Sequence, residues 1–249
     1  MTFTAVVAAL VFSASAPAPL ECLGKYYAGT AVQADGGWAW QLPDGTSIPY
    51  DDGRVKTLEE RVEEPDIEDV FRVKYETGPI RPVIGEGEIE DPGRARLEPV
   101  FYATYGRTPD KVRLGKLRFF GLRIPVHERV LPAFERAVAR LEPLVRERPQ
   151  LLKFLRPHGG SYQWRRIRGS RLLSTHAWGI ALDLNVDRSN YWKWQRPKKP
   201  LVWKNRVPQE IVDAFEAEGF IWGGRWLHYD TMHFEYRPEM LDPACRPRH

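Results

Sequence analysis

An aspartate near the end of a short apolar run is the feature that most constrains how this chain folds. The run from Gly179 to Leu184 reads Gly-Ile-Ala-Leu-Asp-Leu, a pattern typical of a buried strand, and Asp183 lies near its carboxyl end. A carboxylate in such surroundings is costly unless it is ion-paired, hydrogen-bonded or bound to a metal. The sequence therefore predicts a buried strand and a partner for Asp183 close to it.

Two histidines are placed to supply that partner. His176 lies on the turn that leads into the strand, and Gly179 allows the backbone to reverse so that His176 and Asp183 converge. His233 lies well downstream in an alternating apolar and polar stretch, in which His233 and Glu235 share one face of a strand. A histidine in a strand is more often a core or surface residue than a ligand, so spacing alone leaves both interpretations open.

Together, His176, Asp183 and His233 form a set of two imidazoles and one carboxylate. Catalytic zinc is typically held by three such ligands, which leave a fourth position for water. Asp230, in the same block as His233, would then accept the proton of that water. The residues point to hydrolysis assisted by one zinc ion, although other divalent cations also fit this ligand set.

Three motifs in a fixed order resemble the M15 family of zinc peptidases. They are Ser-x-His-x-x-Gly-x-Ala-x-Asp at 174–183, Trp-Gly-Gly-x-Trp at 222–226 and Asp-x-Met-His-Phe-Glu at 230–235. The resemblance extends over roughly residues 151–236, about a third of the chain. It implies an α+β fold and the hydrolysis of peptide bonds in bacterial peptidoglycan, as in D-alanyl-D-alanine carboxypeptidases and L-alanyl-D-glutamate endopeptidases.

The resemblance also implies roles for individual residues. It makes His176, Asp183 and His233 the ligands of one zinc ion and Asp230 the general base. Many relatives have glutamate at the position of the base, and the shorter aspartate is typical of the endopeptidase branch. Whether the enzyme removes a terminal D-alanine or cuts an internal bond stays open.

An arginine upstream is a candidate for stabilising the transition state. The register Tyr-x-x-Arg-x-Ile-x-Gly at 162–169 resembles the family segment in which an arginine faces the scissile carbonyl, and it selects Arg165 rather than Arg166. A guanidinium beside the metal polarises that carbonyl and stabilises the developing oxyanion. The alternative is that Arg165 belongs to a generally basic surface.

Two further polar residues belong to the motifs. Ser174 hydrogen-bonds the substrate, orients His176 or caps a local turn, and we assign it to substrate binding. Glu235 is either a partner of His233 or a solvated residue on the strand. We favour the solvated position for Glu235.

Basic residues gather on both sides of the predicted site. The chain has 37 Lys and Arg against 33 Asp and Glu, but residues 146–171 contain eight basic residues and one acid, and residues 188–206 contain seven and none. Residues 59–69 are the reverse, with seven acids. The basic stretches favour an anionic polymer such as a bacterial cell wall as partner.

Tryptophans in the second stretch could stack on bases or sugars or close a core, but no nucleic-acid-binding motif is present and we expect no nucleic acid to bind.

The first twenty residues contain no charged side chain. The apolar run 5–12 and the following Ala14-Ser-Ala16 are typical of a secretory signal peptide, although the usual leading Lys or Arg is missing. The run is too short to span a membrane. We therefore predict export to the periplasm or the exterior. There Cys22 and Cys245 can form a disulfide, whereas in the cytosol they would be free thiols.

The remaining chain divides by composition. Residues 21–110 are rich in Gly, Pro and Asp and contain no catalytic motif, which predicts an irregular N-terminal extension that either wraps the catalytic domain, our preference, or acts as a cell-wall adaptor. Residues 111–249 are predicted to form the peptidase domain, with helices within 127–145 and 208–219. Helices packed on a small antiparallel sheet with a single zinc site make the expected fold α+β.

Two functions are compatible with these features. The first is a monomeric zinc metallopeptidase that hydrolyses peptidoglycan stem peptides. The second is a non-catalytic cell-wall-binding protein that retains the peptidase fold. A degenerate relative should have lost His176, Asp230 or His233, so the filled positions favour the enzyme.

Overall fold

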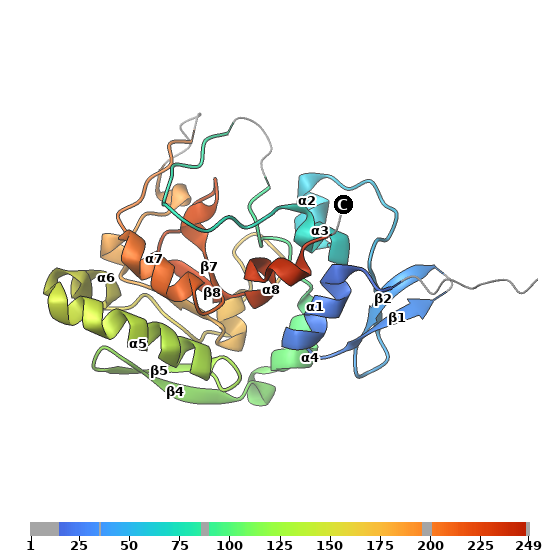
Figure 1. Ribbon diagram of the computed structural model, residues 1–249, viewed down its shortest axis with the longest axis horizontal. Helices are drawn as coiled ribbons and strands as arrows, with labels where there is room; N and C mark the ends of the chain where they lie inside the picture. Colours follow the sequence, from blue (N-terminus) through green and yellow to red (C-terminus); the bar gives the residue numbers. More distant parts are fainter. Residues whose placement is uncertain (1–14, 35, 86–89, 196–200, 248–249) are drawn as a thin grey trace, which may run out of the picture.

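The computed structural model describes residues 15–34, 36–85, 90–195 and 201–247 (Figure 1). Of the predicted leader, residues 1–14 lie outside the described residues, and 18–20 begin the first helix. The helices are α1 (Ala18–Tyr26), α2 (Leu58–Glu63), α3 (Ile67–Arg72), α4 (Glu98–Tyr105), α5 (Leu131–Glu147), α6 (Leu152–Leu155), α7 (Gln209–Glu216) and α8 (Pro238–Leu241). The strands are β1 (Thr30–Ala34), β2 (Gly37–Gln41), β3 (Ser47–Pro49), β4 (Leu114–Phe119), β5 (Leu122–His127), β6 (Ala181–Asp183), β7 (Phe220–Trp222) and β8 (His233–Tyr236).

The fold is α+β, as predicted, but its strands form three antiparallel sheets rather than one. Strands β1, β2 and β3 form one sheet, β4 and β5 form a hairpin, and the third sheet has the order β6-β8-β7. Strand β8 lies at the centre of the third sheet, and its register places Asp183 opposite His233. This pairing brings the two sequence motifs together.

Helices α5 and α7 pack against each other beside β7 and β8 (Figure 1), and Phe134 of α5 contacts Phe220 of β7 with ring centroids 4.4 Å apart. Helix α7 packs against β7, and Phe234 of β8 packs against Phe215 of α7 with ring centroids 4.4 Å apart. Since side chains alternate along a strand, the burial of Phe234 on the helix side turns its neighbours His233 and Glu235 to the opposite face. The core thus aims the polar residues of β8 toward the site.

The hairpin of β4 and β5 was not foreseen in the sequence. Its strands alternate in burial, and α5 packs against β4. The hairpin supports the turn before β6, because the His127 N–H donates to the Gly179 carbonyl at 2.8 Å. Gly179 has a φ of +67°, and a Cβ there would lie 3.0 Å from the His127 nitrogen, so this left-handed turn requires glycine.

The N-terminal residues share the hydrophobic core of the C-terminal half. Tyr75 is buried, and its hydroxyl donates to Glu216 at 2.6 Å and accepts from the Trp222 N–H at 2.7 Å. Further along, the Asp91 carboxylate accepts from the Leu227 N–H at 2.7 Å. The segment before α4 is therefore anchored on the loop between β7 and β8.

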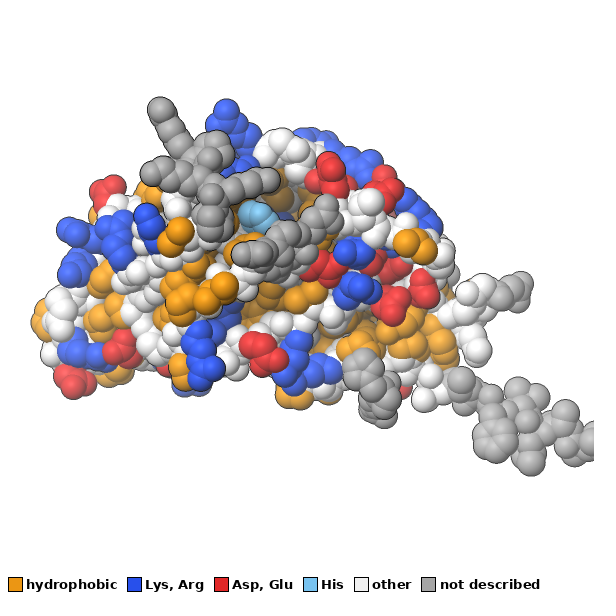
Figure 2. Space-filling view, turned by 90° about the horizontal axis from the view of Figure 1, so that it is seen from above, with side chains coloured by type: hydrophobic (Ala, Val, Ile, Leu, Met, Phe, Trp, Pro, Cys, Tyr) orange, Lys and Arg blue, Asp and Glu red, His pale blue; other side chains and the backbone are white. Residues whose placement is uncertain are grey.

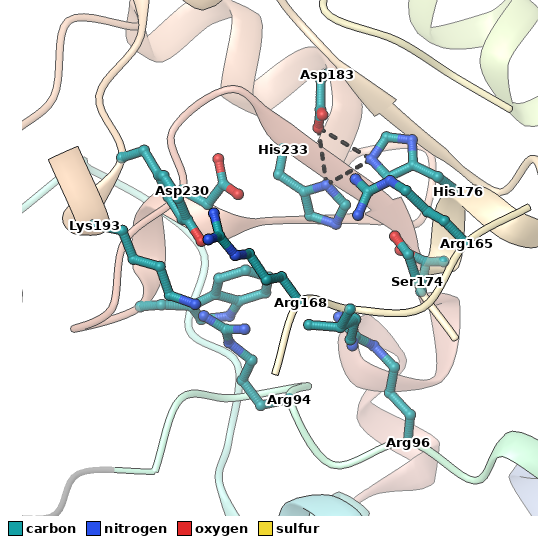
Figure 3. Close-up of a pocket in the computed structure, with 14 residues that line it drawn as sticks. Arg94, Arg96, Arg165, Arg168, Ser174, His176, Asp183, Lys193, Asp230 and His233 are labelled. Atoms are coloured by element: carbon teal, nitrogen blue, oxygen red, sulfur yellow. Dashed lines mark hydrogen bonds and ion pairs between the residues drawn. The ribbon is translucent and has the colours of Figure 1, made fainter. Parts of the chain in front are cut away.

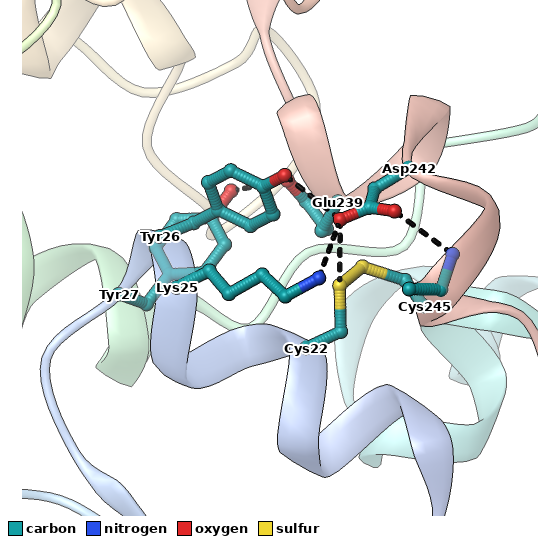
Figure 4. Close-up of a disulfide and its surroundings, with 8 residues drawn as sticks. Cys22, Lys25, Tyr26, Tyr27, Glu239, Asp242 and Cys245 are labelled. Carbon is teal, nitrogen blue, oxygen red and sulfur yellow. Dashed lines mark hydrogen bonds and ion pairs between the residues drawn. A yellow bond between two sulfur atoms is a disulfide. The ribbon is translucent and has the colours of Figure 1, made fainter.

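Cys22 and Cys245 form a disulfide between α1 and the turn after α8, with Cα atoms 4.9 Å apart (Figure 4). Beside it, Asp242 accepts hydrogen bonds from Lys25 at 3.0 Å and from the Tyr26 hydroxyl at 2.9 Å. The bond links two ends of the described chain. Within the described residues, no helix has the length and apolar character needed to cross a membrane.

Acidic and basic stretches of the sequence meet on the surface. On the face seen in Figure 2, Asp and Glu side chains gather in one area beside Lys and Arg side chains. Arg171, from the first basic stretch, pairs with Glu64 at 2.6 Å, and the buried Lys56 lies 2.8 Å from Asp66. Part of the charge of both stretches is therefore compensated within the protein.

Candidate metal centre

The side chains of His176, Asp183 and His233 converge on one point (Figure 3). The Asp183 Oδ1 atom lies 3.2 Å from His176 Nε2 and 3.0 Å from His233 Nδ1, and the two nitrogens are 3.3 Å apart. Ligands at about 2.0–2.1 Å from a tetrahedral zinc ion are separated by roughly 3.3 Å. The triangle of donor atoms has the size that such an ion needs.

Backbone pairing holds His176 in place. Gly160 pairs with Asp183, which brings residues 159–161 alongside β6. The Ser161 carbonyl oxygen then lies 2.8 Å from His176 Nδ1. A proton on Nδ1 satisfies this hydrogen bond and leaves Nε2 with a free lone pair toward Asp183.

His233 is fixed in the same way by a carboxylate. Its Nε2 atom lies 3.0 Å from Glu235 Oε2, which favours the proton on that nitrogen and leaves Nδ1 with a lone pair. Two imidazole lone pairs and the Asp183 oxygen then face one another with no donor between them. A cation at their centre, either a proton or a metal ion, would relieve this repulsion.

The electrostatics of the triad favour a bound cation. Burial opposes a charge on Asp183 and on His233. The nearby imidazoles nevertheless hold the pKa of Asp183 below its usual value. For His233, burial is outweighed by hydrogen bonds to Asp183 and Glu235, and the pKa is raised to about 10. The two carboxylates thus create a negative potential at the position where the donor atoms converge.

Asp230 has the opposite environment. Its Oδ1 atom is buried and has no hydrogen-bond partner among the described residues. Burial, together with the charge of Asp183, raises the pKa of Asp230 to about 6. A carboxylate that is neither paired nor hydrogen-bonded and that titrates near neutral pH is suited to exchange protons.

The structure corrects the solvated position that the sequence favoured for Glu235. The side chain is fully buried, and Arg96 binds it with two hydrogen bonds of 3.2 and 2.7 Å. Thr175 donates to it at 2.9 Å and Arg237 at 3.3 Å. These cations and His233 hold the pKa of Glu235 well below its usual value despite its burial. The reason for the error is that its main partner, Arg96, is remote in sequence.

Arg165 and Ser174 line the same cavity of about 150 Å³ as the triad and Asp230. Arg165 is exposed, and its Nε donates to the Gln163 side chain at 3.1 Å. Ser174 is buried, its N–H donates to the Arg165 carbonyl at 3.0 Å, and its hydroxyl forms no capping bond to the turn Thr175–Trp178 among the described residues. The structure thus brings all six predicted residues to one cavity.

Sequence reasoning missed the contribution of the N-terminal segment to this cavity. Arg94 and Arg96 line it, yet they follow an Asp91-Pro-Gly stretch that indicates only a turn. No local pattern connects these arginines to β8. The only available signal was Glu235 on the same strand face as His233, since a buried acid requires a cationic partner.

Comparison with known proteins bears on the part of the chain that carries the motifs. Residues 168–236 match a family model described as D-alanyl-D-alanine carboxypeptidase. The match includes the triad, Asp230 and Ser174, whereas Arg165 precedes it. It supports the assignment of this region to the M15 peptidases, and the resemblance seen in the sequence is confirmed. Searches of curated proteins and of solved structures returned no match.

Proposed function

We propose that the protein is a zinc-dependent metallopeptidase that hydrolyses peptide bonds in peptidoglycan stem peptides. The observation that carries the proposal is the triangle of His176, Asp183 and His233 donor atoms beside the unpaired carboxylate of Asp230. The family match supports a peptidase, and the donor set fits one zinc ion. In this proposal those three residues hold the ion.

The residues around the triad divide the remaining chemistry. Zinc, when bound, lowers the pKa of water and polarises a carbonyl oxygen. Asp230 accepts the proton of the attacking water and then donates it to the leaving amine, as a general base and acid. Its raised pKa suits both steps, because the carboxylate and the carboxylic acid are both accessible near neutral pH.

Arg165 and Ser174 are assigned to the substrate. Arg165 places its guanidinium in the cavity and stabilises the negative charge that develops on the carbonyl oxygen. The Ser174 hydroxyl, which caps no turn among the described residues, is free to hydrogen-bond the peptide. Both roles act on the substrate, so neither residue is needed for metal binding.

We further propose that the protein is exported, which would place it with its substrate. The buried disulfide between Cys22 and Cys245 supports this, because disulfides persist mainly in oxidising compartments.

We also propose that residues 21–110 wrap the peptidase domain of residues 111–249, since the N-terminal part supplies Arg94 and Arg96 to the cavity.

The test is digestion of purified stem peptides by zinc-loaded protein, with and without a chelator, followed by mass spectrometry. Chelator-sensitive products are expected, and their masses separate the loss of D-alanine from internal cleavage. The variant His176→Ala should lose both zinc and activity, whereas Arg165→Ala should keep zinc and lose about 10²–10³-fold in catalytic rate. Intact peptides in the presence of stoichiometric zinc would instead favour a wall-binding protein.

A further inference from the structure

Cationic side chains from three separate segments line one cavity beside the triad (Figure 3). One segment precedes α4, the second is the loop before Ser174, and the third is the turn Trp192–Trp194. The cations are Arg94, Arg96, Arg165, Arg168 and Lys193. Among the described residues, Arg94 pairs with Asp91 and Arg96 with Glu235, whereas the other three cations form no ion pair. The cavity is therefore suited to an anionic group of the substrate in addition to the scissile carbonyl.

These cations differ in whether the protein already binds and orients them. Arg96 is bound by Glu235 through two hydrogen bonds. Arg168 and Lys193 are exposed, so fixing their flexible side chains on a ligand costs conformational entropy. Arg165 has the proposed role of stabilising the oxyanion. Arg94 is the remaining cation, and it is held by packing on Trp226 and by a longer ion pair with Asp91.

Arg94 is held in one orientation but keeps donors available. Its guanidinium carbon lies 4.5 Å above the Trp226 ring, one terminal nitrogen donates to the His228 carbonyl at 3.3 Å, and Nε lies 3.7 Å from the Asp91 carboxylate. The Nε atom has no hydrogen-bond partner among the described residues, although it is buried. The other terminal nitrogen of Arg94, Nη1, forms no hydrogen bond among the described residues, and the side chain lines the cavity. A stacked guanidinium of this kind is preorganised to bind a carboxylate.

The position of Arg94 indicates which part of the substrate it contacts. Trp226 contacts both Arg94 and His233, with a ring-centroid distance of 5.9 Å to the imidazole. Figure 3 shows Arg94 and Asp230 on the same side of the triad, and both line the cavity. In the proposed reaction Asp230 protonates the leaving amine, so the leaving residue lies on that side.

We propose that Arg94 binds an α-carboxylate on the carbon that carries the leaving amine, and thereby determines specificity. The inference rests on the proposed function. A C-terminal D-alanine has such a carboxylate, and so does a D-glutamate linked onward through its γ-carboxyl group. An ordinary α-linked peptide has an uncharged amide at this position. The extension would therefore supply the residue that distinguishes cell-wall peptides from common peptides.

The test uses two matched substrate pairs and full-length, zinc-loaded protein. One pair is a peptide ending in D-alanyl-D-alanine as the free acid and as the C-terminal amide. The other is an L-alanyl-γ-D-glutamyl-lysine peptide with its α-carboxylate free or amidated. The pair that is cleaved identifies the source of the carboxylate. The Arg94→Met variant should lose about 10- to 100-fold in kcat/KM on the acid, mainly through KM, and little on the amide.

Two further variants control for charge and folding. Arg81→Met removes an exposed arginine from the same N-terminal region but outside the cavity, and it should leave both substrates unaffected. Arg94→Lys keeps the positive charge and should lose less on the acid than Arg94→Met. An equal loss on acid and amide, or no loss on the acid, would overturn the inference while leaving the peptidase function intact.

A binding measurement separates this inference from the proposed function. Calorimetry with the uncleaved acid and amide peptides on Asp230→Asn protein, with and without Arg94→Met, reports recognition without turnover. If wild-type protein cleaves nothing but the acid binds in an Arg94-dependent manner, the peptidase proposal fails and the Arg94 assignment stands. If no peptide is bound or cleaved, both are wrong.

Discussion

At the scale of single residues, the two acids of the site have opposite environments. Asp183 lies between imidazoles, which hold its pKa below the usual value, whereas burial without a partner raises the pKa of Asp230 to about 6. One carboxylate is thus held as an anion for a cation, and the other is able to exchange a proton near neutral pH. Such a divergence between neighbouring acids is typical of active sites.

Asp230→Asn tests this division of roles. A raised pKa in the folded state means that ionised Asp230 destabilises the metal-free fold, a penalty that is absent below about pH 4 and complete above about pH 6. The variant should keep zinc, lose at least about 10²-fold in turnover, and gain on the order of 1–3 kcal/mol in the unfolding free energy of metal-free protein at pH 7. Zinc titration, peptide digestion and denaturant unfolding measure these effects.

Asp183→Asn is the matched control for that variant. Its pKa is lowered in the folded state, so the ionised group stabilises the metal-free fold above its unfolded pKa, and removing it should destabilise the protein and abolish zinc binding. If Asp230→Asn retained full turnover, or if both variants lost zinc equally, the assignment of Asp230 as base would be wrong.

The pH profile of activity should report the same carboxyl. The base form of Asp230 is lost as the pH falls through its pKa, so kcat/KM should decrease tenfold per pH unit on the acid side of the profile. Bound metal lowers the pKa of Asp230 further, so this decrease should begin at or below about pH 6. The charged groups that act on it are Asp183, His233, Arg94 and His176. Arg94→Met should move this decrease to higher pH, and Arg81→Met should not. The measurement is kcat/KM against pH at saturating zinc for the wild type, Arg94→Met and Arg81→Met.

At the scale of elements, the segment before α4 is joined to β8 through a buried ion pair. Arg96 binds Glu235, and Glu235 in turn contacts His233. Arg96 touches no donor atom of the triad, so we assign it a positioning role: it keeps Glu235 ionised and aimed at the imidazole. Partners of this kind typically change metal affinity by about 10- to 100-fold.

Arg96→Met should therefore weaken zinc binding by about 10- to 100-fold, because Glu235 then loses both hydrogen bonds from Arg96. Competition with a chromogenic chelator measures the affinity. Glu235→Gln should have a similar effect, and the double variant should be little worse than either single one. A variant that unfolds at lower temperature but binds zinc as tightly as the wild type would reduce Arg96 to a purely structural residue.

The limits of sequence-based prediction also appear at this scale. Strands β6 and β8 and helix α7 were predictable, because their apolar patterns and the His and Asp motifs are local. The β4–β5 hairpin was missed even though its strands alternate, since the sequence offered no motif to draw attention to it. Arg94 and Arg96 were not predictable as site residues, because their partners lie in a distant part of the chain and only the folded structure brings them together.

At the scale of the whole molecule, the N-terminal residues and the last helices form a single hydrogen-bonded cluster. The Tyr27 hydroxyl of the chain after α1 donates to the buried Glu239 of α8 at 2.6 Å, and the disulfide fastens the same two regions (Figure 4). Since Arg237 precedes α8 and also contacts Glu235, this cluster borders the polar network beneath the triad. We infer that loosening the ends of the chain lowers the stability of the whole fold rather than of one part.

Replacing both Cys22 and Cys245 with serine tests this inference. A crosslink across 223 residues restricts the unfolded chain strongly, so its loss should cost about 2–5 kcal/mol and lower the melting temperature by roughly 5–15 °C. Activity well below the melting temperature should be retained, because neither cysteine lines the cavity. Thermal unfolding of wild type with and without reductant, compared with the double variant, measures the effect, and reductant should not change the variant further. An unchanged melting temperature would show that the cluster holds without the disulfide, whereas lost activity in a fully folded variant would mean that the bond also shapes the site.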